Sequence, residues 1–282
     1  MNALDIVPLA PIAVPRRSLA LGTYTFEIDT GIVIVGSDPH WTISQPTTTA
    51  TKALVQLTAR FAEEGSLRAI ILAGDLPDFG QISRHTPLGW ERHGSLAEEL
   101  KIVNERLGEI KAVAGLGTQL VRVKGNHCAR YDARLAAVAP EFAGVRGFSL
   151  DEQLDPDWQP CMVCEINPGP FGLIVKHRHR GGANAAHGNA TAAGKCIATG
   201  HTHQPNVVRL SNAATGSFWA SISGRWRTWV RPRSPIRTEQ PQRAWPAGLP
   251  RSGSSRGSTD VCSGPRSSMS LIPTWSRSEA SY

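Results

Sequence analysis

Short polar clusters of Asp, His and Asn recur along the chain, each at the expected end of a strand. The five clusters are Asp38-Pro39-His40, Gly74-Asp75-Leu76-Pro77-Asp78, Gly125-Asn126-His127, His177 and Gly200-His201-Thr202-His203. In layered α/β folds, ligands bind beyond the carboxyl ends of the strands. Carboxylate, amide and imidazole groups all bind divalent metal ions. The pattern therefore predicts a dinuclear metal centre, with Asp75 as the carboxylate that both ions share.

The segments before these clusters predict the strands that position them. Residues 31–36 and 69–72 are continuously apolar, which is typical of strands covered on both faces. Asp75 then follows the end of the second strand. In an extended segment, residues i and i+2 point the same way, so Asp38 and His40 are expected to share one ion. The two histidines of the last cluster are also two apart on an expected extended segment, where neutral imidazoles are good metal ligands.

The elements between the clusters predict a layered α/β fold. Residues 51–64 place apolar side chains at helical spacing between two buried strands, and this order predicts a βαβ unit with parallel strands. Residues 95–98 form a capping box that opens a second helix, and residues 119–124 predict a further strand. Residues 161–166 and 171–176 predict two adjacent strands joined by a turn rich in Pro and Gly. This order of elements indicates a second sheet packed on the first.

Taken together, the five clusters resemble the motifs of the calcineurin-like metallophosphoesterases in order and spacing, over roughly residues 31–220. Two longer stretches are similar to phage and prophage members of that family: GDLPDFGQISRH at residues 74–85 and GNHCAR at residues 125–130. The resemblance implies an α/β fold of the four-layer αββα sandwich type, with two central mixed sheets flanked by helices. It also implies a dinuclear centre that hydrolyses phosphoester bonds.

The resemblance assigns a ligand set to each ion. The implied ligands are Asp38, His40 and His203 for the first ion and Asn126, His177 and His201 for the second, with Asp75 bridging the two. One position departs from the family pattern, because Arg178 follows His177 where glycine is usual. His177 and His179 therefore both stay open as the ligand, and we favour His177. The expected ion is Mn²⁺, with Fe and Zn²⁺ as alternatives.

Four further residues receive a role from the resemblance. His127 would be the acid beside the leaving group, and Asp78 would orient His127 or a metal ligand. Arg84 and Arg130 would hold phosphate oxygens, although arginines that simply face solvent are an equal alternative. Arg84 belongs to a polar loop over residues 79–93, and loops of this length are often functional.

The expected reaction is metal-dependent hydrolysis of a phosphodiester, as in a nuclease, because the likeness is to phage members. A protein phosphatase, a dinucleotide hydrolase and an inactivated phosphoesterase scaffold remain as alternatives. The complete set of Asp, Asn and His side chains argues against a scaffold, since a binding module needs no full ligand set. The expected partner is a phosphoester, a nucleotide or a nucleic acid.

The basic net charge belongs to the end of the chain. The sequence contains 30 Lys and Arg and 23 Asp and Glu, a formal charge of +7. Residues 221–282 contain ten Arg, no Lys and three acidic residues, a net of +7, so residues 1–220 have 20 residues of each sign. We therefore predict a catalytic domain over residues 1–220 and a disordered tail, rich in Arg, Ser and Pro, over residues 221–282. The neutral domain provides no charge argument for nucleic-acid binding.

Two explanations of the tail stay open. One is a basic arm that binds nucleic acid, with Arg neutralising phosphates and Trp stacking on bases. The other is translation in a shifted reading frame, which yields such a mixture from GC-rich DNA and removes the late sheet strands. We favour the shifted frame, because ten arginines without one lysine are unusual in a basic arm. Translation of the other two frames from about codon 220 distinguishes the two.

Cysteine usage and hydropathy predict a protein of the cytoplasm that does not enter membranes. The five cysteines are odd in number, and Cys161-x-x-Cys164 has no second pair, so we expect strand residues and no zinc knuckle. No run reaches the roughly 18 apolar residues that span a bilayer. Arg16 and Arg17 follow the apolar run near the N-terminus, which is the reverse of the order in a secretory signal.

Overall fold

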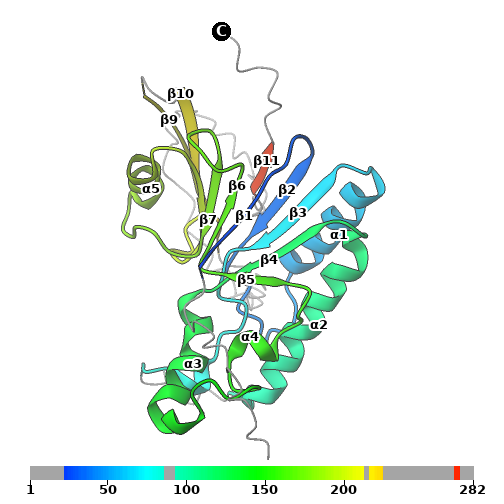
Figure 1. Ribbon diagram of the computed structural model, residues 1–282, viewed down its shortest axis with the longest axis vertical. Helices are drawn as coiled ribbons and strands as arrows, with labels where there is room; N and C mark the ends of the chain where they lie inside the picture. Colours follow the sequence, from blue (N-terminus) through cyan, green and yellow to red (C-terminus); the bar gives the residue numbers. More distant parts are fainter. Residues whose placement is uncertain (1–21, 86–92, 213–215, 225–269, 274–282) are drawn as a thin grey trace, which may run out of the picture.

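The computed structural model describes residues 22–85, 93–212, 216–224 and 270–273. Within these residues, two mixed β-sheets pack face to face, and helices cover the outer face of each sheet (Figure 1). The predicted α/β fold with two central mixed sheets flanked by helices is therefore confirmed. No helix of the described part of the chain is long and apolar enough to cross a membrane.

The first sheet contains the βαβ unit expected between residues 31 and 72. Its strands, in spatial order, are β11 (Ser270–Pro273), β2 (Ile32–Gly36), β3 (Leu67–Leu72), β4 (Gln119–Val123) and β5 (Gln159–Cys161). Strands β2 to β5 are parallel, and β11 runs antiparallel to β2. Helix α1 (Thr49–Glu63) joins β2 to β3. Helix α2 (Leu96–Ala114) precedes β4 and begins with the predicted capping box.

The second sheet contains the later strands and the N-terminal strand. Its strands, in spatial order, are β1 (Thr23–Phe26), β6 (Val163–Ile166), β7 (Leu173–Lys176), β8 (Cys196–Thr199), β10 (Gly216–Ile222) and β9 (Asn206–Asn212). The predicted pair around the 167–170 turn is present as antiparallel β6 and β7. The β9–β10 pair follows no motif that we recognised in the sequence. Helix α5 (Ala185–Ala193) packs on β8, β9 and β10.

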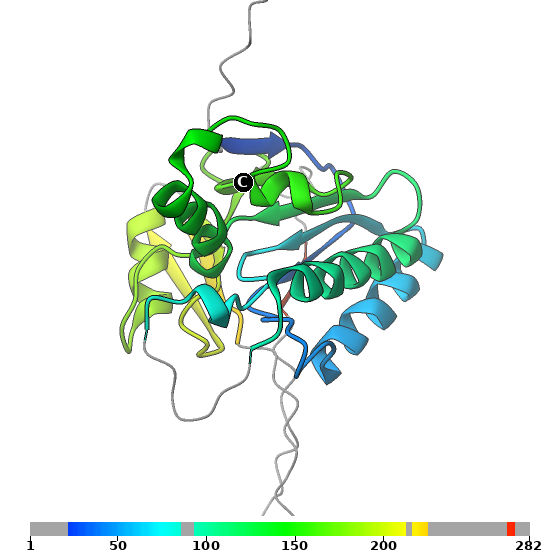
Figure 2. The same ribbon diagram turned by 90° about the horizontal axis from the view of Figure 1, so that it is seen from below.

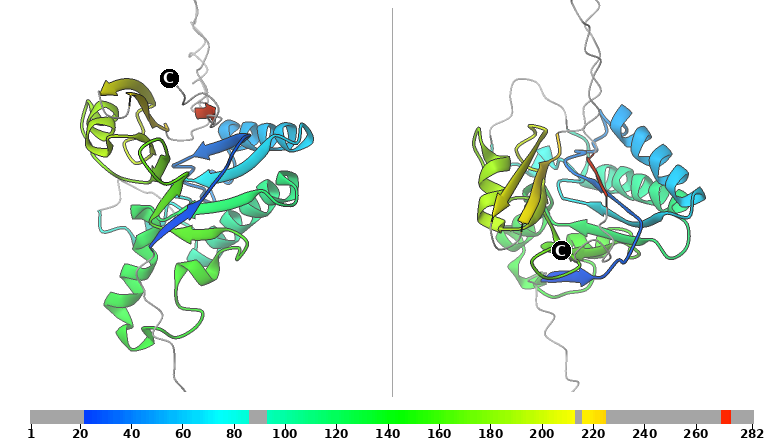
Figure 3. Two further views of the ribbon diagram at one scale, coloured as in Figure 1. Left: turned by 45° about the horizontal axis from the view of Figure 1, so that its top comes forward. Right: turned by 90° about the horizontal axis from the view of Figure 1, so that it is seen from above.

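Alternate side chains of the strands face different cores, which creates the layers. In β2, Val33 and Val35 are buried between the two sheets, whereas Ile34 is buried against α1 and α2. Ile71 and Ile70 of β3 divide in the same way. The layers therefore follow one another as α5, second sheet, first sheet, and α1 with α2 (Figures 2 and 3). Each fully buried aliphatic side chain contributes about 1.5–3 kcal/mol.

Two local expectations need correction. The single strand expected over residues 161–166 is divided, because the chain leaves the first sheet at Cys161 and enters the second at Val163. Cys161 and Cys164 are buried in the same core between the sheets, and burial raises the pKa of both thiols. The strand expected over residues 119–124 ends at Val123, and Asn126 of the cluster that follows it begins helix α3 (Asn126–Val138).

The predicted boundary at residue 220 falls near the end of β10. This strand continues to Ile222, and the structure describes the chain as far as residue 224. Of the predicted tail, only residues 221–224 and 270–273 are described, and the latter form β11. The remainder of the predicted tail lies outside the described residues, as does the segment 86–92 of the predicted polar loop.

Candidate metal centre

The chain segments that follow β2 and β3 stay side by side beyond the strand ends. The backbone N–H of Asp38 donates to the carbonyl oxygen of Gly74 at 3.1 Å, and the N–H of His40 donates to that of Asp75 at 3.1 Å. These bonds fix Asp38 and His40 relative to Asp75. The side chains of all three residues are buried. Main-chain hydrogen bonds thereby bring together residues that lie 36 positions (Asp38 and Gly74) and 35 positions (His40 and Asp75) apart in the sequence.

A first cluster of donor atoms is formed by Asp38, His40 and His203. The Nε2 atom of His40 lies 3.2 Å from Nε2 of His203 and 3.8 Å from Oδ1 of Asp38. The remaining edge, from His203 Nε2 to Asp38 Oδ1, is 3.3 Å. Two atoms that each lie about 2.1 Å from one ion are roughly 3.0–3.4 Å apart in octahedral or tetrahedral geometry. The 3.2 and 3.3 Å edges fall in this range and the 3.8 Å edge is longer, so a small movement of one side chain would place all three atoms around a single divalent ion.

Asp78 orients His40 toward this cluster. Its Oδ1 atom lies 2.8 Å from Nδ1 of His40 and 3.2 Å from Nδ1 of His127. A carboxylate on Nδ1 of a histidine holds the proton there and leaves Nε2 available to a metal. Burial alone would raise the pKa of Asp78, but hydrogen bonds from His127 and His40 outweigh burial and hold the pKa well below its ordinary range.

A second cluster is formed by Asp75, His177 and His201, whose donor atoms all lie within 4.8 Å of one another. His177 Nε2 lies 3.1 Å from Asp75 Oδ2 and 2.9 Å from the amide oxygen of Asn126. On the other side of the ring, Nδ1 donates to the carbonyl oxygen of Ala73 at 2.9 Å. Because a carbonyl oxygen can only accept, Nδ1 carries the proton and Nε2 faces the cluster.

The structure distinguishes the two histidines that the sequence left open. His177 is 3% exposed and lies in the second cluster. Burial lowers its pKa, but the hydrogen bond and the charge of Asp75 outweigh burial and raise it overall. His179 belongs to none of the donor clusters within the described residues, where its Nε2 is buried without a hydrogen-bond partner. Burial and the charges of Lys176 and Arg180 lower the pKa of His179.

Asp75 lies between His177 of the second cluster and His127 of helix α3. Its side chain is 1% exposed, and its Oδ2 lies 3.9 Å from Nε2 of His127. Burial alone would raise the pKa of Asp75, but the hydrogen bond and charge of His177, together with the charges of His127 and His40, lower it. The carboxylate is therefore ionised and surrounded by imidazoles, as a metal ligand in this position must be.

His127 and Arg130 lie beside the two clusters on α3. Nδ1 of His127 donates to the carbonyl oxygen of Asp78 at 2.8 Å, and Arg130 Nη1 donates to the same oxygen at 2.8 Å. Arg130 Nη2 lies 3.1 Å from Nε2 of His127. Arg84 is exposed after η1 (Gly80–Ile82), and within the described residues it makes no hydrogen bond to this group. The structure thus brings Arg130, but not Arg84, to the other predicted residues.

Backbone strain is concentrated at the predicted ligands. Among described non-glycine residues, seven have positive φ, and five of these are Asp38 (57°), His40 (47°), Asp75 (52°), His201 (70°) and His203 (57°). The extended segments expected at 38–40 and 201–203 are therefore wrong. In both segments, residues in the left-handed region replace the extended conformation. Such conformations cost about 1–3 kcal/mol each and cluster at functional sites.

The motif glycines are required by close packing against the donor side chains. A Cβ atom on Gly74 would lie 2.6 Å from Nδ1 of His177, and one on Gly125 would lie 2.1 Å from Oδ1 of Asp75. A Cβ atom on Gly200 would meet Oγ of Ser37 at 1.9 Å. Contacts below 3.0 Å cannot be accommodated without a shift of the neighbouring group. Each glycine therefore lets the main chain approach a polar side chain of the site.

Comparison with known proteins adds no argument about fold or function. The chain matches no family model and no curated protein. Similar solved structures include a single mutant of Vps29 from Entamoeba histolytica, with 14% identity over 69% of this chain and 74% of that chain and a TM-score of 0.33. They also include Yfce, a phosphoesterase from E. coli, with 15% identity over 69% of this chain and 79% of that chain and a TM-score of 0.30. The assignment of function therefore depends on the side chains described above.

One buried carboxylate beside the site was missed in the sequence. Glu99 of α2 is 4% exposed, and its Oε1 accepts from the backbone N–H groups of Asp78 and Phe79 at 2.6 and 2.7 Å. Its position was a usable signal, because it lies three residues after Leu96 and four before Val103 on the apolar face of the helix. A charged residue on a buried face indicates a specific partner.

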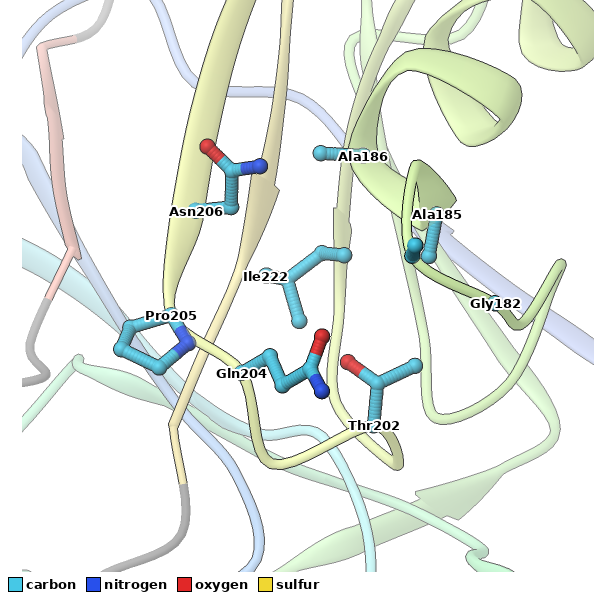
Figure 4. Close-up of a pocket in the computed structure, with 9 residues that line it drawn as sticks. Gly182, Ala185, Ala186, Thr202, Gln204, Pro205, Asn206 and Ile222 are labelled. Carbon is cyan, nitrogen blue, oxygen red and sulfur yellow. The ribbon is translucent and has the colours of Figure 1, made fainter.

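A small cavity lies next to the loop that carries His201 and His203. It has a volume of about 130 Å³ and is lined by residues of the loop before α5, of α5, and of segments 202–206 and 222. Thr202 and Gln204 extend their side chains toward Ile222 in this cavity (Figure 4). None of the predicted ligands lines it. The cavity is a neighbour of the two donor clusters and is distinct from them.

Proposed function

We propose that this chain hydrolyses phosphoester bonds with a dinuclear metal centre, and that its substrates are phosphodiesters such as a nucleic-acid backbone. The observation that carries the proposal is the convergence of two adjacent donor clusters, Asp38–His40–His203 and Asp75–His177–His201. A purely structural role does not account for this group, because four of its members, Asp38, His40, Asp75 and His177, are buried, and burying paired carboxylates and imidazoles is costly without a ligand to satisfy them. The preference for diesters is supported by the likeness of two sequence stretches to phage phosphoesterases.

The donor atoms fit divalent ions of the Mn²⁺, Fe and Zn²⁺ type. Both clusters offer oxygen and nitrogen atoms, which suit these ions. No thiol joins them within the described residues, since Cys128 of α3 is buried in the apolar core and burial raises its pKa to about 11. We propose that Asp75 is shared by two ions, that Asp38, His40 and His203 hold one, and that Asn126, His177 and His201 hold the other.

When bound by these residues, two divalent ions would supply positive charge for the phosphate oxygens and would lower the pKa of a water molecule toward neutral pH. The residues of the chain supply orientation. Asp78 and the Ala73 carbonyl hold Nδ1 of His40 and of His177, so that Nε2 of each ring faces its cluster. The backbone N–H of His127 and the imidazole of His177 hold the two carboxylate oxygens of Asp75 before any substrate arrives. This preorganisation lowers the cost of reorganisation during the reaction.

We assign the acid role to His127. Its Nδ1 proton is held by the carbonyl oxygen of Asp78, so Nε2 is the atom that can carry a second proton toward a departing oxygen. The same Nε2 lies 3.9 Å from Asp75, which places it at the edge of the second cluster. General acids in this position typically contribute about 10²–10⁴-fold to the rate. We propose that Arg130, whose guanidinium contacts Nε2, binds phosphate oxygens of the substrate; the same role for Arg84 rests on the sequence resemblance alone.

The proposal is tested with the metal-free protein and two chromogenic substrates. After metal removal, we expect no hydrolysis of bis-p-nitrophenyl phosphate or p-nitrophenyl phosphate. Addition of Mn²⁺ should restore hydrolysis, with the diester cleaved faster than the monoester. Faster cleavage of the monoester would reverse the substrate preference, and absence of activity with Mn²⁺, Fe²⁺ and Zn²⁺ would contradict the enzyme assignment.

A further inference from the structure

Glu99 holds the loop that carries Asp78 through hydrogen bonds from two main-chain N–H groups and one side-chain amide. Oε1 accepts from the N–H groups of Asp78 and Phe79, and Oε2 accepts from the side-chain amide of Gln81 at 3.2 Å. Within the described residues, Glu99 has no basic partner that would form an ion pair. Burial raises the pKa of Glu99, because a buried carboxylate loses the hydration that favours its charged form.

The peptide unit that joins Asp78 to Phe79 is bound on both of its edges. Its N–H donates to Glu99, and its carbonyl oxygen accepts from His127 Nδ1 and Arg130 Nη1, each at 2.8 Å. In a trans peptide, the N–H and C=O point in opposite directions. Glu99 on one side of this peptide therefore determines where the carbonyl oxygen lies for His127 on the other.

The conformation that Glu99 holds is strained. Phe79 has φ of 49°, in the left-handed region that an aromatic residue rarely adopts. Phe79 itself is fully buried in the core beside α1 and α2. Without acceptors for the two N–H groups, a rotation of this peptide would relieve the strain and move the carbonyl oxygen away from His127.

We propose that Glu99 is a positioning residue for the phosphoester hydrolysis proposed above, because it fixes the peptide that orients the proton donor His127 and Arg130. The proposal rests on that function. Since Glu99 acts as a hydrogen-bond acceptor and not through its charge, glutamine, whose amide oxygen accepts in the same way, should recover most of its effect. Leucine fits the apolar face of α2 but accepts no hydrogen bond.

The test compares Glu99→Leu and Glu99→Gln with the wild-type protein. The control is Glu105→Leu, because Glu105 is exposed on the same helix. Two diesters of similar shape are used, bis-p-nitrophenyl phosphate and diphenyl phosphate. p-Nitrophenolate leaves without a proton, whereas phenolate depends on an acid. We expect Glu99→Leu to lower kcat for diphenyl phosphate by up to about 100-fold, with a smaller loss for the nitrophenyl diester and metal content unchanged.

A second readout works in the metal-free protein and does not depend on activity. Nitrogen-15 NMR of the imidazoles should show the Nδ1–H form of His127 in wild type, Glu99→Gln and Glu105→Leu, and a mixture of tautomers in Glu99→Leu. Should Glu99→Leu fail to fold, Glu99→Asp, which is too short to reach both N–H groups, replaces it. The proposal would be overturned if Glu99→Leu, or Glu99→Asp in its place, left both the His127 tautomer and the ratio of the two diester rates unchanged. It would also be overturned if Glu99→Gln and Glu99→Leu lost equal activity. If the wild-type protein is inactive on both diesters but Glu99→Leu still shows the expected tautomer change, the proposed function is wrong and the positioning role of Glu99 stands.

Discussion

The backbone N–H of His127 donates to Oδ1 of Asp75 at 2.8 Å. One carboxylate therefore accepts a hydrogen bond at the first turn of α3 through Oδ1 and faces His177 through Oδ2. A carboxylate at a helix N-terminus is stabilised by the free N–H groups there. This relationship links the position of the proposed proton donor to that of the proposed bridging ligand.

Because Asp75 is both a proposed metal ligand and a hydrogen-bond acceptor for His127, we expect Asp75→Asn and His127→Ala to differ in metal content. In Asp75→Asn the amide oxygen can still accept from His127 N–H, so we expect the fold to persist while metal content and activity are lost together. In His127→Ala the donor clusters are intact, so metal content should remain and turnover should fall about 10²–10⁴-fold. Metal analysis and a hydrolysis assay on both proteins check this. Retention of full metal content by Asp75→Asn would contradict the bridging role.

The structure predicts unequal effects at His177 and His179. His177 is buried in the second cluster, so His177→Gln should lower metal content and activity at least 10-fold. His179 lies outside both clusters, so His179→Gln should change neither. Calorimetric titration of each variant with Mn²⁺ measures its metal binding and distinguishes the two histidines. The opposite order of effects would identify His179 as the ligand.

Gly125 tests whether close approach to Asp75 is required. Gly125 has φ of −94°, which alanine adopts readily, so the effect of Gly125→Ala comes from its Cβ contact with Asp75. We expect a loss of roughly 1–3 kcal/mol in the free energy of unfolding and weaker metal binding. Gly108→Ala is the control, because nothing lies within 4 Å of a Cβ atom there. It should stabilise α2 by about 0.5–1 kcal/mol, measured by urea unfolding.

If Gly125→Ala binds metal as wild type does, the close contact is not required for the site. If Gly108→Ala also weakened metal binding, the effect at Gly125 could not be attributed to Asp75.

The pKa shifts predict how pH affects the metal-free protein. The pKa values of Asp38 and Asp75 are lowered, so their contribution to stability is present above about pH 4 and is lost as pH falls through the folded-state pKa. The pKa of His177 is raised, so its contribution is present below about pH 6.5 and is lost as pH rises through its folded-state pKa. Thermal unfolding of the metal-free protein should therefore show highest stability between these limits.

Metal binding should change that profile. Mn²⁺ needs neutral imidazoles, so its stabilising effect should be larger at pH 8 than at pH 5.5. At 100 times its dissociation constant, the ion adds about 2.7 kcal/mol, or roughly 5–10 °C in Tm. The measurement is Tm with and without Mn²⁺ at both pH values. An equal gain at both would show that the imidazoles are not ligands.

Much of this fold is readable from sequence because its signals are local. Continuous apolar runs identified β2 and β3, and the capping box of Ser95 and Glu98 identified the start of α2. The division of residues 161–166 between two sheets was not readable, because a change of sheet depends on the packing of both sheets and leaves no local pattern. The β9–β10 pair was also not predicted, because we recognised no turn motif between its two strands.

The candidate site shows the same contrast. Residue types and order were sufficient to select the donor residues, whereas the expected extended geometry at Asp38 and His40 was wrong. Positive φ at these residues is imposed by the tertiary hydrogen bonds to the chain after β3. Glu99 was missed because its partners are backbone N–H groups, which no side-chain motif records.

The central claim is that the two donor clusters hold a pair of divalent ions, and counting those ions tests it most directly. The full chain is stripped of metal, equilibrated with Mn²⁺, dialysed, and analysed for metal per chain, with Asp75→Asn measured in parallel. The account predicts about two ions per chain in the wild type and a large loss in the variant. Wild-type protein that retains no metal, or that binds the same amount with and without the Asp75 carboxylate, would contradict it.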